Sequence, residues 1–204
     1  MFSRLARTAE LFRGTKVPDQ QYRPGEHGPI VQDVEFEDRV VERYWLNPPF
    51  AYVVVTYDDQ QDKHLYRVIE PSLDRFETDL IESLYDDVRT PLLYGAGQGD
   101  PEGVLKGELR RRLKKYGVET DVAGFYRLYY YLYRRFRGFG RIDPLMHDPA
   151  IEDISCDGYE VPLYVYHDDY QDIETNVSFD QDELDSYIVR MAQQAGRHIS
   201  VGNP

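Results

Sequence analysis

The sequence of 204 residues predicts an α+β fold, in which an N-terminal hairpin-and-helix region with a helical bundle precedes an antiparallel sheet with flanking helices. Two β-rich runs, at 50–55 and 65–69, are followed by apolar residues at helical spacing through residue 137. Short strand-like runs separated by acidic turns then occupy 151–179. A hydrophobic fraction of 41% is typical of a globular chain, so these elements are expected to enclose a core.

The first elements lie between residues 50 and 88. The runs 50–55 and 65–69 enclose a polar segment and predict a β-hairpin. Apolar side chains then recur every three or four residues from Leu73 to Val88, which predicts a helix. Ser72 stands directly before this pattern, and we expect it to cap the first turn.

Two further helices are predicted near 101–116 and 121–137, the second ending at Gly138. The glycine-rich stretch 95–99 lacks the Lys and Ser or Thr of a phosphate-binding loop, so we interpret it as a linker. Both helices carry arginines beside aromatic residues. This pattern is typical of a packed stripe with arginines paired to acids, and it also occurs on partner-binding and nucleic-acid-binding surfaces.

The last third of the chain predicts three short strands, at 151–155, 163–166 and 173–179. Asp180 and Glu183 have the spacing of a capping box, which predicts that a helix begins there. Residues 198–201 have the pattern of one more strand.

These patterns divide the chain into four segments. We expect a flexible N-terminal arm, a hairpin-plus-helix region, a helical region and a sheet domain that is incomplete at its C-terminal end, at 1–34, 35–97, 98–138 and 139–204. The first segment is interrupted by several prolines and glycines, which favours an arm over a packed element.

The net charge of the chain argues against nucleic-acid binding. The net charge of −13 would repel a phosphate backbone unless positive charge were concentrated on one face, so we expect no nucleic-acid partner. Only five of the 24 basic residues are lysines. An acid-rich, lysine-poor surface suits a high-salt cytoplasm, which leads us to expect a halophilic host.

No constellation of residues supports catalysis by the chain itself. The lone Cys156 excludes an intrachain disulfide, and the five histidines lack the spacing of a zinc site. His167, Asp168 and Asp169 could hold a cation, although a solvated turn is the more common structure for such a cluster. We therefore expect no catalytic residue and no metal site.

The stretch 138–158, GFGRIDPLMHDPAIEDISCDG, resembles the pre-catalytic domain of the type II/IV secretion ATPases, and in particular their archaeal branch. The likeness continues through 162–167, 174–177 and 195–204. Upstream, 44–53 and 69–71 are similar to archaeal pilus and archaellum motors. The resemblance implies a PAS-like fold for 139–204, in the N-terminal region of a hexameric ATPase.

The family implies partners and cofactors for the complete protein. Neighbouring subunits of a homo-hexamer and an integral membrane platform protein are the expected partners, at the cytoplasmic face of the membrane. ATP and Mg²⁺ are the implied cofactors, held by a RecA-like domain with Walker motifs. The 204 residues contain no such motif. We therefore expect a chain that stops before the phosphate-binding loop and binds neither cofactor tightly.

The resemblance also implies that this region supplies arginines toward the nucleotide. By position in the motif these are Arg190, followed by Arg197. A guanidinium can donate a fork of hydrogen bonds to phosphate oxygens, so domain closure can couple hydrolysis to movement. The structural alternative is that Arg190 pairs with an acid of its own helix, such as Asp185 or Glu183.

Two other functions remain open from the sequence. The chain could be a stand-alone adaptor that shares the fold and has no motor domain. It could also be a module that binds single-stranded nucleic acid through the arginine- and tyrosine-rich helices.

Overall fold

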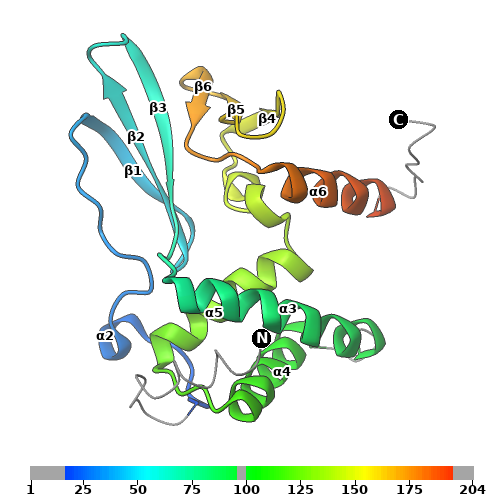
Figure 1. The fold of residues 1–204 in the computed structure, drawn as a ribbon. Coiled ribbons are helices and arrows are strands. Elements are labelled where there is room, and N and C mark those ends of the chain that lie inside the picture. Colours follow the sequence, from blue (N-terminus) through cyan, green and yellow to red (C-terminus); the bar gives the residue numbers. More distant parts are fainter. Residues whose placement is uncertain (1–16, 96–99, 195–204) are drawn as a thin grey trace. The chain divides into compact units, whose positions relative to one another are not determined.

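The computed structural model describes residues 17–95 and 100–194 (Figure 1). These residues form two compact units, each assembled from segments that are distant in sequence. The helical unit comprises the described residues of 1–34, 48–51 and 70–138. The sheet unit comprises the described residues of 35–47, 52–69 and 139–204.

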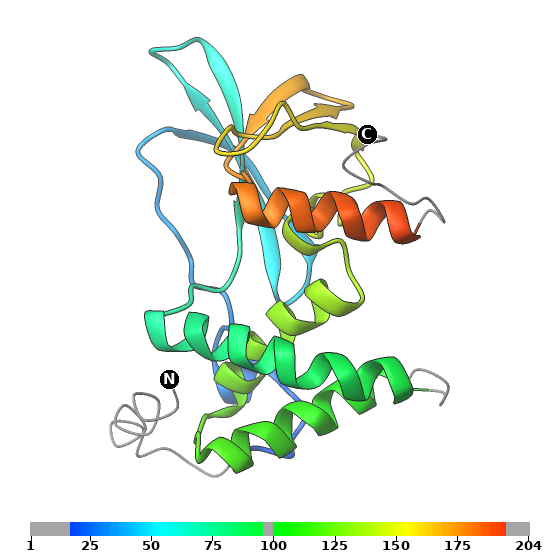
Figure 2. The ribbon, with the colours of Figure 1, turned by 45° about the vertical axis from the view of Figure 1, so that its right-hand side comes forward.

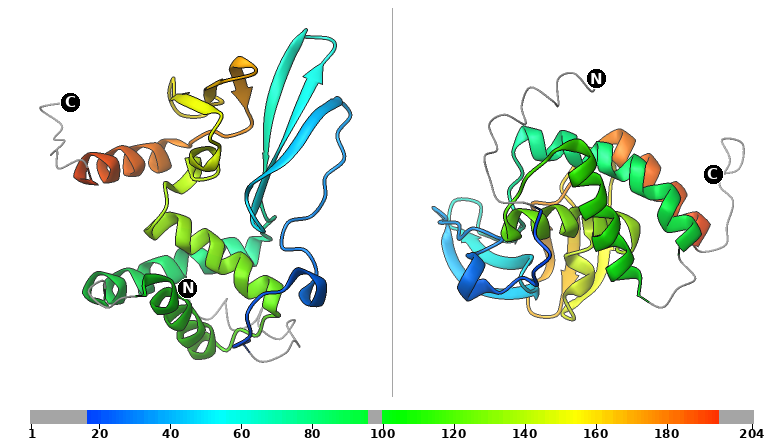
Figure 3. Two further views of the ribbon diagram at one scale, coloured as in Figure 1. Left: turned by 180° about the vertical axis from the view of Figure 1, so that it is seen from behind. Right: turned by 90° about the horizontal axis from the view of Figure 1, so that it is seen from below.

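The helical unit is built on three long helices and one short one (Figure 3). These are α2 (Pro24–His27), α3 (Arg75–Gly95), α4 (Pro101–Tyr116) and α5 (Val122–Phe136). The three long helices lie where the apolar spacing predicts them. Arg197, residues 198–201 and most of the glycine-rich stretch lie outside the described residues.

The helix ends show which side chains satisfy the first backbone N–H groups. Asp100 accepts a hydrogen bond from the N–H of Gly103 at 3.0 Å, and Asp121 accepts one from Gly124 at 2.6 Å. The prediction that Ser72 caps α3 is wrong. Asp74 is the cap, because its carboxylate accepts from the N–H of Glu77 at 2.7 Å while the Glu77 carboxylate accepts from the N–H of Asp74 at 3.1 Å.

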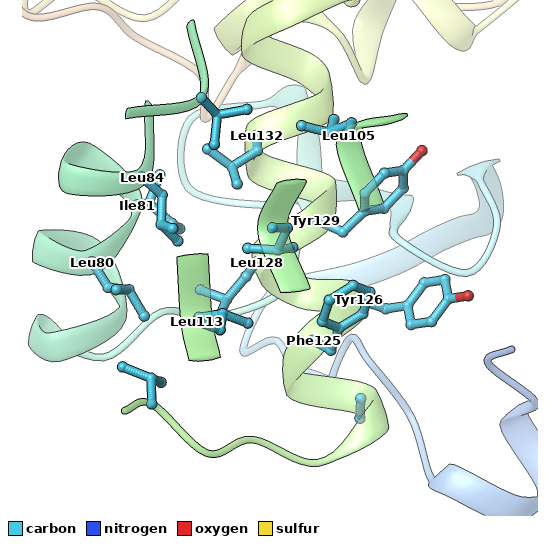
Figure 4. Packing of buried hydrophobic residues seen from close by; sticks show 14 of the residues in the cluster. Leu80, Ile81, Leu84, Leu105, Leu113, Phe125, Tyr126, Leu128, Tyr129 and Leu132 are labelled. Carbon is cyan, nitrogen blue, oxygen red and sulfur yellow. The ribbon is translucent and has the colours of Figure 1, made fainter. Parts of the chain in front are cut away.

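A continuous apolar core fills the space between α3, α4 and α5 (Figure 4). Residues three or four positions apart on α3 and α4 are buried in it, and α5 contributes a broader buried face. The fully buried members include Leu84, Leu109, Leu113, Phe125 and Leu132.

Residues 17–34 are the described part of the segment 1–34 that was expected to be a flexible arm, and several of their side chains pack against the helical core. Ile30 and Val31 are buried, with 3% and 5% of their surface exposed. The ring of Tyr22 packs against that of Tyr126, with the ring centroids 5.7 Å apart. Apolar residues of this segment therefore pack against the helical core.

The sheet unit contains one six-stranded sheet in the order β1-β2-β3-β6-β5-β4 (Figure 2). Its strands are β1 (Arg39–Asn47), β2 (Ala51–Asp58), β3 (Lys63–Ile69), β4 (Ile151–Ser155), β5 (Tyr164–His167) and β6 (Gln171–Thr175). β2 and β3 pair antiparallel where the sequence predicts a hairpin.

The sheet as a whole is mixed. Within 139–204, where the sequence predicts an antiparallel sheet, β4 pairs antiparallel with β5 and β5 pairs antiparallel with β6. β3 and β6 run parallel, with Leu65 opposite Glu174 and Tyr66 opposite Thr175. The side chain of Asn176 extends this pairing. Its Oδ1 accepts from the N–H of Val68 at 2.8 Å and its Nδ2 donates to the carbonyl of Val68 at 2.9 Å.

The remaining elements of the sheet unit are two short 3₁₀ turns and one helix, namely η2 (Gly140–Ile142), η3 (Leu145–His147) and α6 (Gln181–Gln194). The predicted capping box of α6 is confirmed. Asp180 accepts from the N–H of Glu183 at 2.8 Å, and Glu183 accepts from the N–H of Asp180 at 3.5 Å. The ring of Tyr187 on α6 packs against Phe179, with centroids 5.1 Å apart.

The helices and the mixed sheet confirm the α+β class. The PAS-like character of 139–204 stays a prediction. The spatial units cut across the four segments expected from the sequence, because the hairpin strands of 52–69 share a sheet with strands of 151–175.

Candidate functional site

Arg190 lies on the half-buried side of α6, and its guanidinium contacts two features of the sheet unit. Its Cζ lies 5.4 Å from the centroid of the Tyr187 ring, one helical turn earlier. Its Nη2 approaches η2 so closely that a Cβ added to Gly140 would lie 2.6 Å from it. Gly140 has a φ of +61°, so glycine satisfies both the backbone conformation and the contact.

A second arginine, Arg141, joins α6 to the same turn. Its Nε donates to the carbonyl of Ser178 at 3.1 Å, and its Nη2 pairs with Glu183 at 3.2 Å. Glu183, which the sequence offered with Asp185 as a partner for Arg190, thus pairs with Arg141. The available signal for Arg141 was its position inside the motif that resembles the secretion ATPases.

Arg190 of α6 and Arg141 of η2 are therefore both near Gly140. Arg190 packs against Gly140, and Arg141 is the next residue of η2. Burial raises the pKa of the Tyr187 hydroxyl, and the positive charge of Arg190 opposes this rise. The arrangement holds the Arg190 guanidinium against an aromatic ring, which orients it.

Residues 17–95 and 100–194 contain no Walker motif, which is the sequence signature of a phosphate-binding loop. Within the same residues, no three His, Cys, Asp or Glu side chains gather closely enough to hold a metal ion.

A second polar cluster is buried inside the sheet unit. The Asp148 Oδ2 accepts hydrogen bonds from the hydroxyls of Tyr44 and Tyr66, each at 2.6 Å. The Asp148 Oδ1 accepts from the N–H of Ala150 at 3.0 Å. We call Tyr44, Tyr66, Asp148 and His167 the buried tyrosine cluster.

His167 completes this cluster from β5. Its Nδ1 accepts a hydrogen bond from the N–H of Asp169 at 3.1 Å, so the neutral ring carries its proton on Nε2. The Nε2 lies 3.2 Å from the Tyr44 hydroxyl and 4.0 Å from the Asp148 carboxylate. The hydrogen bonds therefore run from His167 through Tyr44 to Asp148.

Burial and the neighbouring Asp148 carboxylate raise the pKa of both Tyr44 and Tyr66 far above the usual range. Both hydroxyls consequently remain donors at any physiological pH. The cluster ties β1, β3, β5 and the segment after η3 together, which is a structural role.

The interpretation of His167, Asp168 and Asp169 as a solvated turn is confirmed for the two aspartates, which are exposed in the turn between β5 and β6, and is wrong for His167. His167 is almost fully buried and hydrogen-bonded, so it belongs neither to a solvated turn nor to a cation site. The signal that could have revealed it is the alternation along β5, where Val165 and His167 share the inward face.

The arginine-rich helices of the helical unit use their charges within the unit. Arg112 pairs with Asp87 at 3.0 Å, and Arg127 pairs with Glu77 at 2.7 Å. The other pairs are Arg110–Asp19, Arg111–Glu108, Arg134–Glu70 and Arg135–Glu82. The packed-stripe interpretation accounts for these arginines, and they are not arranged as a free basic surface.

In the described part of the chain, no helix combines the length and the apolar character that crossing a membrane requires.

The fold is of the α+β class. Comparison with known protein families shows which proteins the chain resembles. Residues 1–72 match the family described as "PilB3-like, N-terminal". The first third of the chain is therefore similar to the N-terminal region of PilB-like proteins.

Two proteins of Methanocaldococcus jannaschii are similar to this chain. Uncharacterized protein MJ1288 is 34% identical over 158 residues, which cover 76% of this chain and 63% of MJ1288. Uncharacterized protein MJ0781 is 28% identical over 94 residues, which cover 45% of this chain and 13% of MJ0781. The chain thus spans less than two thirds of either relative.

Proposed function

We propose that this chain is the N-terminal regulatory and assembly region of a hexameric ATPase that powers type IV pilus, archaellum or type II/IV secretion assembly. The observation that carries the proposal is the match of residues 1–72 to the PilB3-like N-terminal family. The likeness of 138–158 to the pre-catalytic domain of secretion ATPases supports the same function from a different part of the chain.

In this proposal Arg190, with Arg197 second, senses the phosphates of ATP·Mg²⁺ bound by a RecA-like domain of the complete protein. The seating of Arg190 on Tyr187 and Gly140 supports this role, because it places a guanidinium at a defined position on α6. A helix that carries such a group can report on phosphate by a small movement.

The proposed partners are neighbouring subunits of a homo-hexamer and an integral membrane platform protein. The proposed location is the cytoplasmic face of the membrane, with peripheral attachment. An archaeal, salt-adapted host is proposed from the excess of 37 acidic over 24 basic residues.

The test is ATP turnover by the complete gene product. Arg190→Ala is expected to lower kcat at least about tenfold, because a phosphate-facing arginine acts mainly on the transition state. Arg190→Lys keeps the charge and loses the fork, so an intermediate rate is expected. Arg137→Ala is the matched control, since Arg137 is exposed on the helical unit and outside the motif.

Thermal unfolding of each variant separates a catalytic effect from loss of the fold. Unchanged turnover in Arg190→Ala with an unchanged melting temperature would remove Arg190 from the proposed role. A gene product with no ATPase activity in any form would instead contradict the proposed function itself.

A stand-alone adaptor is the second candidate, and the relatives favour keeping it. The similar segment makes up 63% of MJ1288 but only 13% of MJ0781, so related sequences occur in proteins of very different length. The mass of the product made from its own gene decides between the two. A product of 204 residues supports the adaptor, and a longer product with a Walker motif supports the motor.

A further inference from the structure

One face of the β4–β5–β6 part of the sheet turns away from the core. Side chains alternate between the two faces along each strand. Val165 and Ile173 are buried with 1% of their surface exposed. Tyr164 and Tyr166 point to the opposite face, where 37% and 40% of their surfaces are exposed.

The register of the strands surrounds these two tyrosines with carboxylates. Tyr166 lies between Asp153 of β4 and Asp172 of β6. Tyr164 lies opposite Glu174 of β6. Cross-strand neighbours of this kind are about 5 Å apart at Cβ, so ring faces and carboxylates present one joint surface. We call these five residues the acidic tyrosine face.

The charges on this face differ in how they are compensated. Glu174 accepts hydrogen bonds from Lys63 and from the Tyr164 hydroxyl, both at 2.9 Å. Asp153 and Asp172 form no ion pair and no side-chain hydrogen bond with other described residues. Their two negative charges therefore remain available to a cation from outside.

The face adjoins an edge of the sheet as the described residues form it. β4 is the last strand in the order β1-β2-β3-β6-β5-β4, so no described strand pairs with one side of its backbone. An unpaired edge can accept an extended peptide as an additional strand through main-chain hydrogen bonds. Alternate side chains of such a peptide would then lie over the acidic tyrosine face.

We propose that the acidic tyrosine face and the edge of β4 bind an extended segment of a partner protein that is rich in arginine and lysine. A guanidinium can pair with Asp153 or Asp172 and lie over the ring of Tyr166. Nucleic acid and anionic lipid are the wrong partners, because their phosphates would meet these carboxylates. The proposal goes beyond the proposed function and does not depend on it.

The dimensions of a sheet permit these contacts. Neighbouring strands lie about 4.8 Å apart, so the backbone of an added strand would lie about 10 Å from that of β5. An extended arginine and the Tyr166 ring together span this distance, and Asp153 lies between them.

The experiment titrates the full chain with a labelled synthetic peptide of alternating arginine and threonine, followed by fluorescence anisotropy at low and high salt. Binding is expected at low salt and weaker binding at high salt, since the charges are exposed. A peptide of alternating glutamate and threonine serves as the charge control. A third peptide, with arginine retained but N-methylated on the amides that would face β4, tests strand addition.

Variants locate the binding. The double variant Asp153→Asn/Asp172→Asn is expected to weaken binding of the arginine peptide about fivefold. Asp79→Asn/Asp86→Asn, two exposed positions on α3, changes the net charge equally and is expected to leave binding within about twofold. Tyr166→Leu keeps apolar area, removes the ring, and is expected to weaken binding about threefold.

Equal effects of the two double variants would overturn the proposal, because they would show that only net charge matters. Equal binding of the glutamate peptide would overturn it as well. Undiminished binding of the N-methylated peptide would overturn strand addition at β4. Far-ultraviolet circular dichroism of each variant confirms that the protein tested is folded.

Discussion

The two units of this protein are stabilised in different ways. The helical unit has a continuous apolar core of leucines and aromatic residues, with most of its ion pairs at the periphery and one pair, Arg134–Glu70, in which the arginine is buried. The sheet unit combines an apolar core with the buried tyrosine cluster, in which Asp148 accepts three hydrogen bonds. Apolar packing tolerates small shifts, whereas a buried carboxylate requires each donor in place.

This difference bears on function. The acceptors and donors of the buried tyrosine cluster come from four separate segments, so they define one arrangement of the strands around η3. Arg190 and the acidic tyrosine face both belong to the sheet unit. The unit that carries the candidate sites thus contains a buried carboxylate whose three hydrogen bonds specify its local geometry.

The largest effect is expected from a cavity in the helical core. Leu109 is fully buried, so Leu109→Ala should lower the free energy of unfolding by about 3 kcal/mol. The ellipticity at 222 nm reports this loss. Fluorescence of Trp45, the only tryptophan, reports the sheet unit separately. A larger change in the Trp45 transition than in ellipticity would contradict the assignment of Leu109 to the helical core.

The matching change in the sheet unit is Asp148→Asn. The amide donors would face the hydroxyls of Tyr44 and Tyr66, so the free energy of unfolding should fall by about 2 kcal/mol. The Trp45 transition measures it. Asp59→Asn, an exposed carboxylate in the turn between β2 and β3, is the control and should be neutral. An equal effect of both changes would show that charge, not the buried cluster, matters.

A smaller effect is expected at the turn that seats Arg190. Gly140→Ala introduces a Cβ 2.6 Å from the Nη2 of Arg190, at a residue with a positive φ. The free energy of unfolding should fall by about 1.5 kcal/mol. Hydrogen exchange along α6 should accelerate while exchange in α4 stays unchanged. Gly107→Ala is the control, because a Cβ there meets nothing within 4 Å. Unchanged exchange in α6 would show that the guanidinium is not seated at η2.

The smallest effect concerns alkaline pH, and it compares one tyrosine from each unit. Burial, with a hydrogen bond to Asp87, raises the pKa of Tyr116 to about 12, and burial with a bond to Glu42 does the same for Tyr170. A raised tyrosine pKa stabilises the fold fully below about pH 10, and this contribution is lost as the pH rises toward 12.

We therefore expect Tyr116→Phe to reduce the loss of stability between pH 9 and 11, by about 1 kcal/mol after solvent screening. Tyr170→Phe should reduce the loss of stability that the Trp45 transition reports. Tyr116→Phe should reduce the loss that the ellipticity reports. The pH dependence of the two transitions measures the effect. A dependence identical to that of the unchanged protein would refute the assignment of the two hydroxyls.

The sequence was most informative where structure depends on near neighbours. The spacing of Leu80, Leu84 and Val88 and the capping box at Asp180 predicted α3 and the start of α6, because helices form from contacts three or four residues apart. Even here the cap of α3 was missed, since Ser72 and Asp74 are both good capping residues and only the reciprocal bond to Glu77 distinguishes them.

The long-range contacts could not be predicted in this way. The parallel pairing of Leu65 with Glu174 depends on residues that are more than a hundred positions apart, and no local pattern encodes it. Arg141 lies in the stretch 138–158 and Arg190 lies between 177 and 195, yet only the structure shows that both side chains belong to η2 or contact it. Arg197 lies outside the described residues, so its predicted role stays a prediction.

The parallel pair of β3 and β6 has a consequence for synthesis on the ribosome. β3 leaves the ribosome before α3, α4 and α5, yet its partner strand begins only at Gln171. At translation rates of about 5 to 20 residues per second, this interval lasts roughly 5 to 20 s. Throughout it, one side of the hairpin is an exposed strand edge, while the helical core can already assemble. The edge of β3 therefore has to be kept from pairing with other chains until β6 has been synthesised.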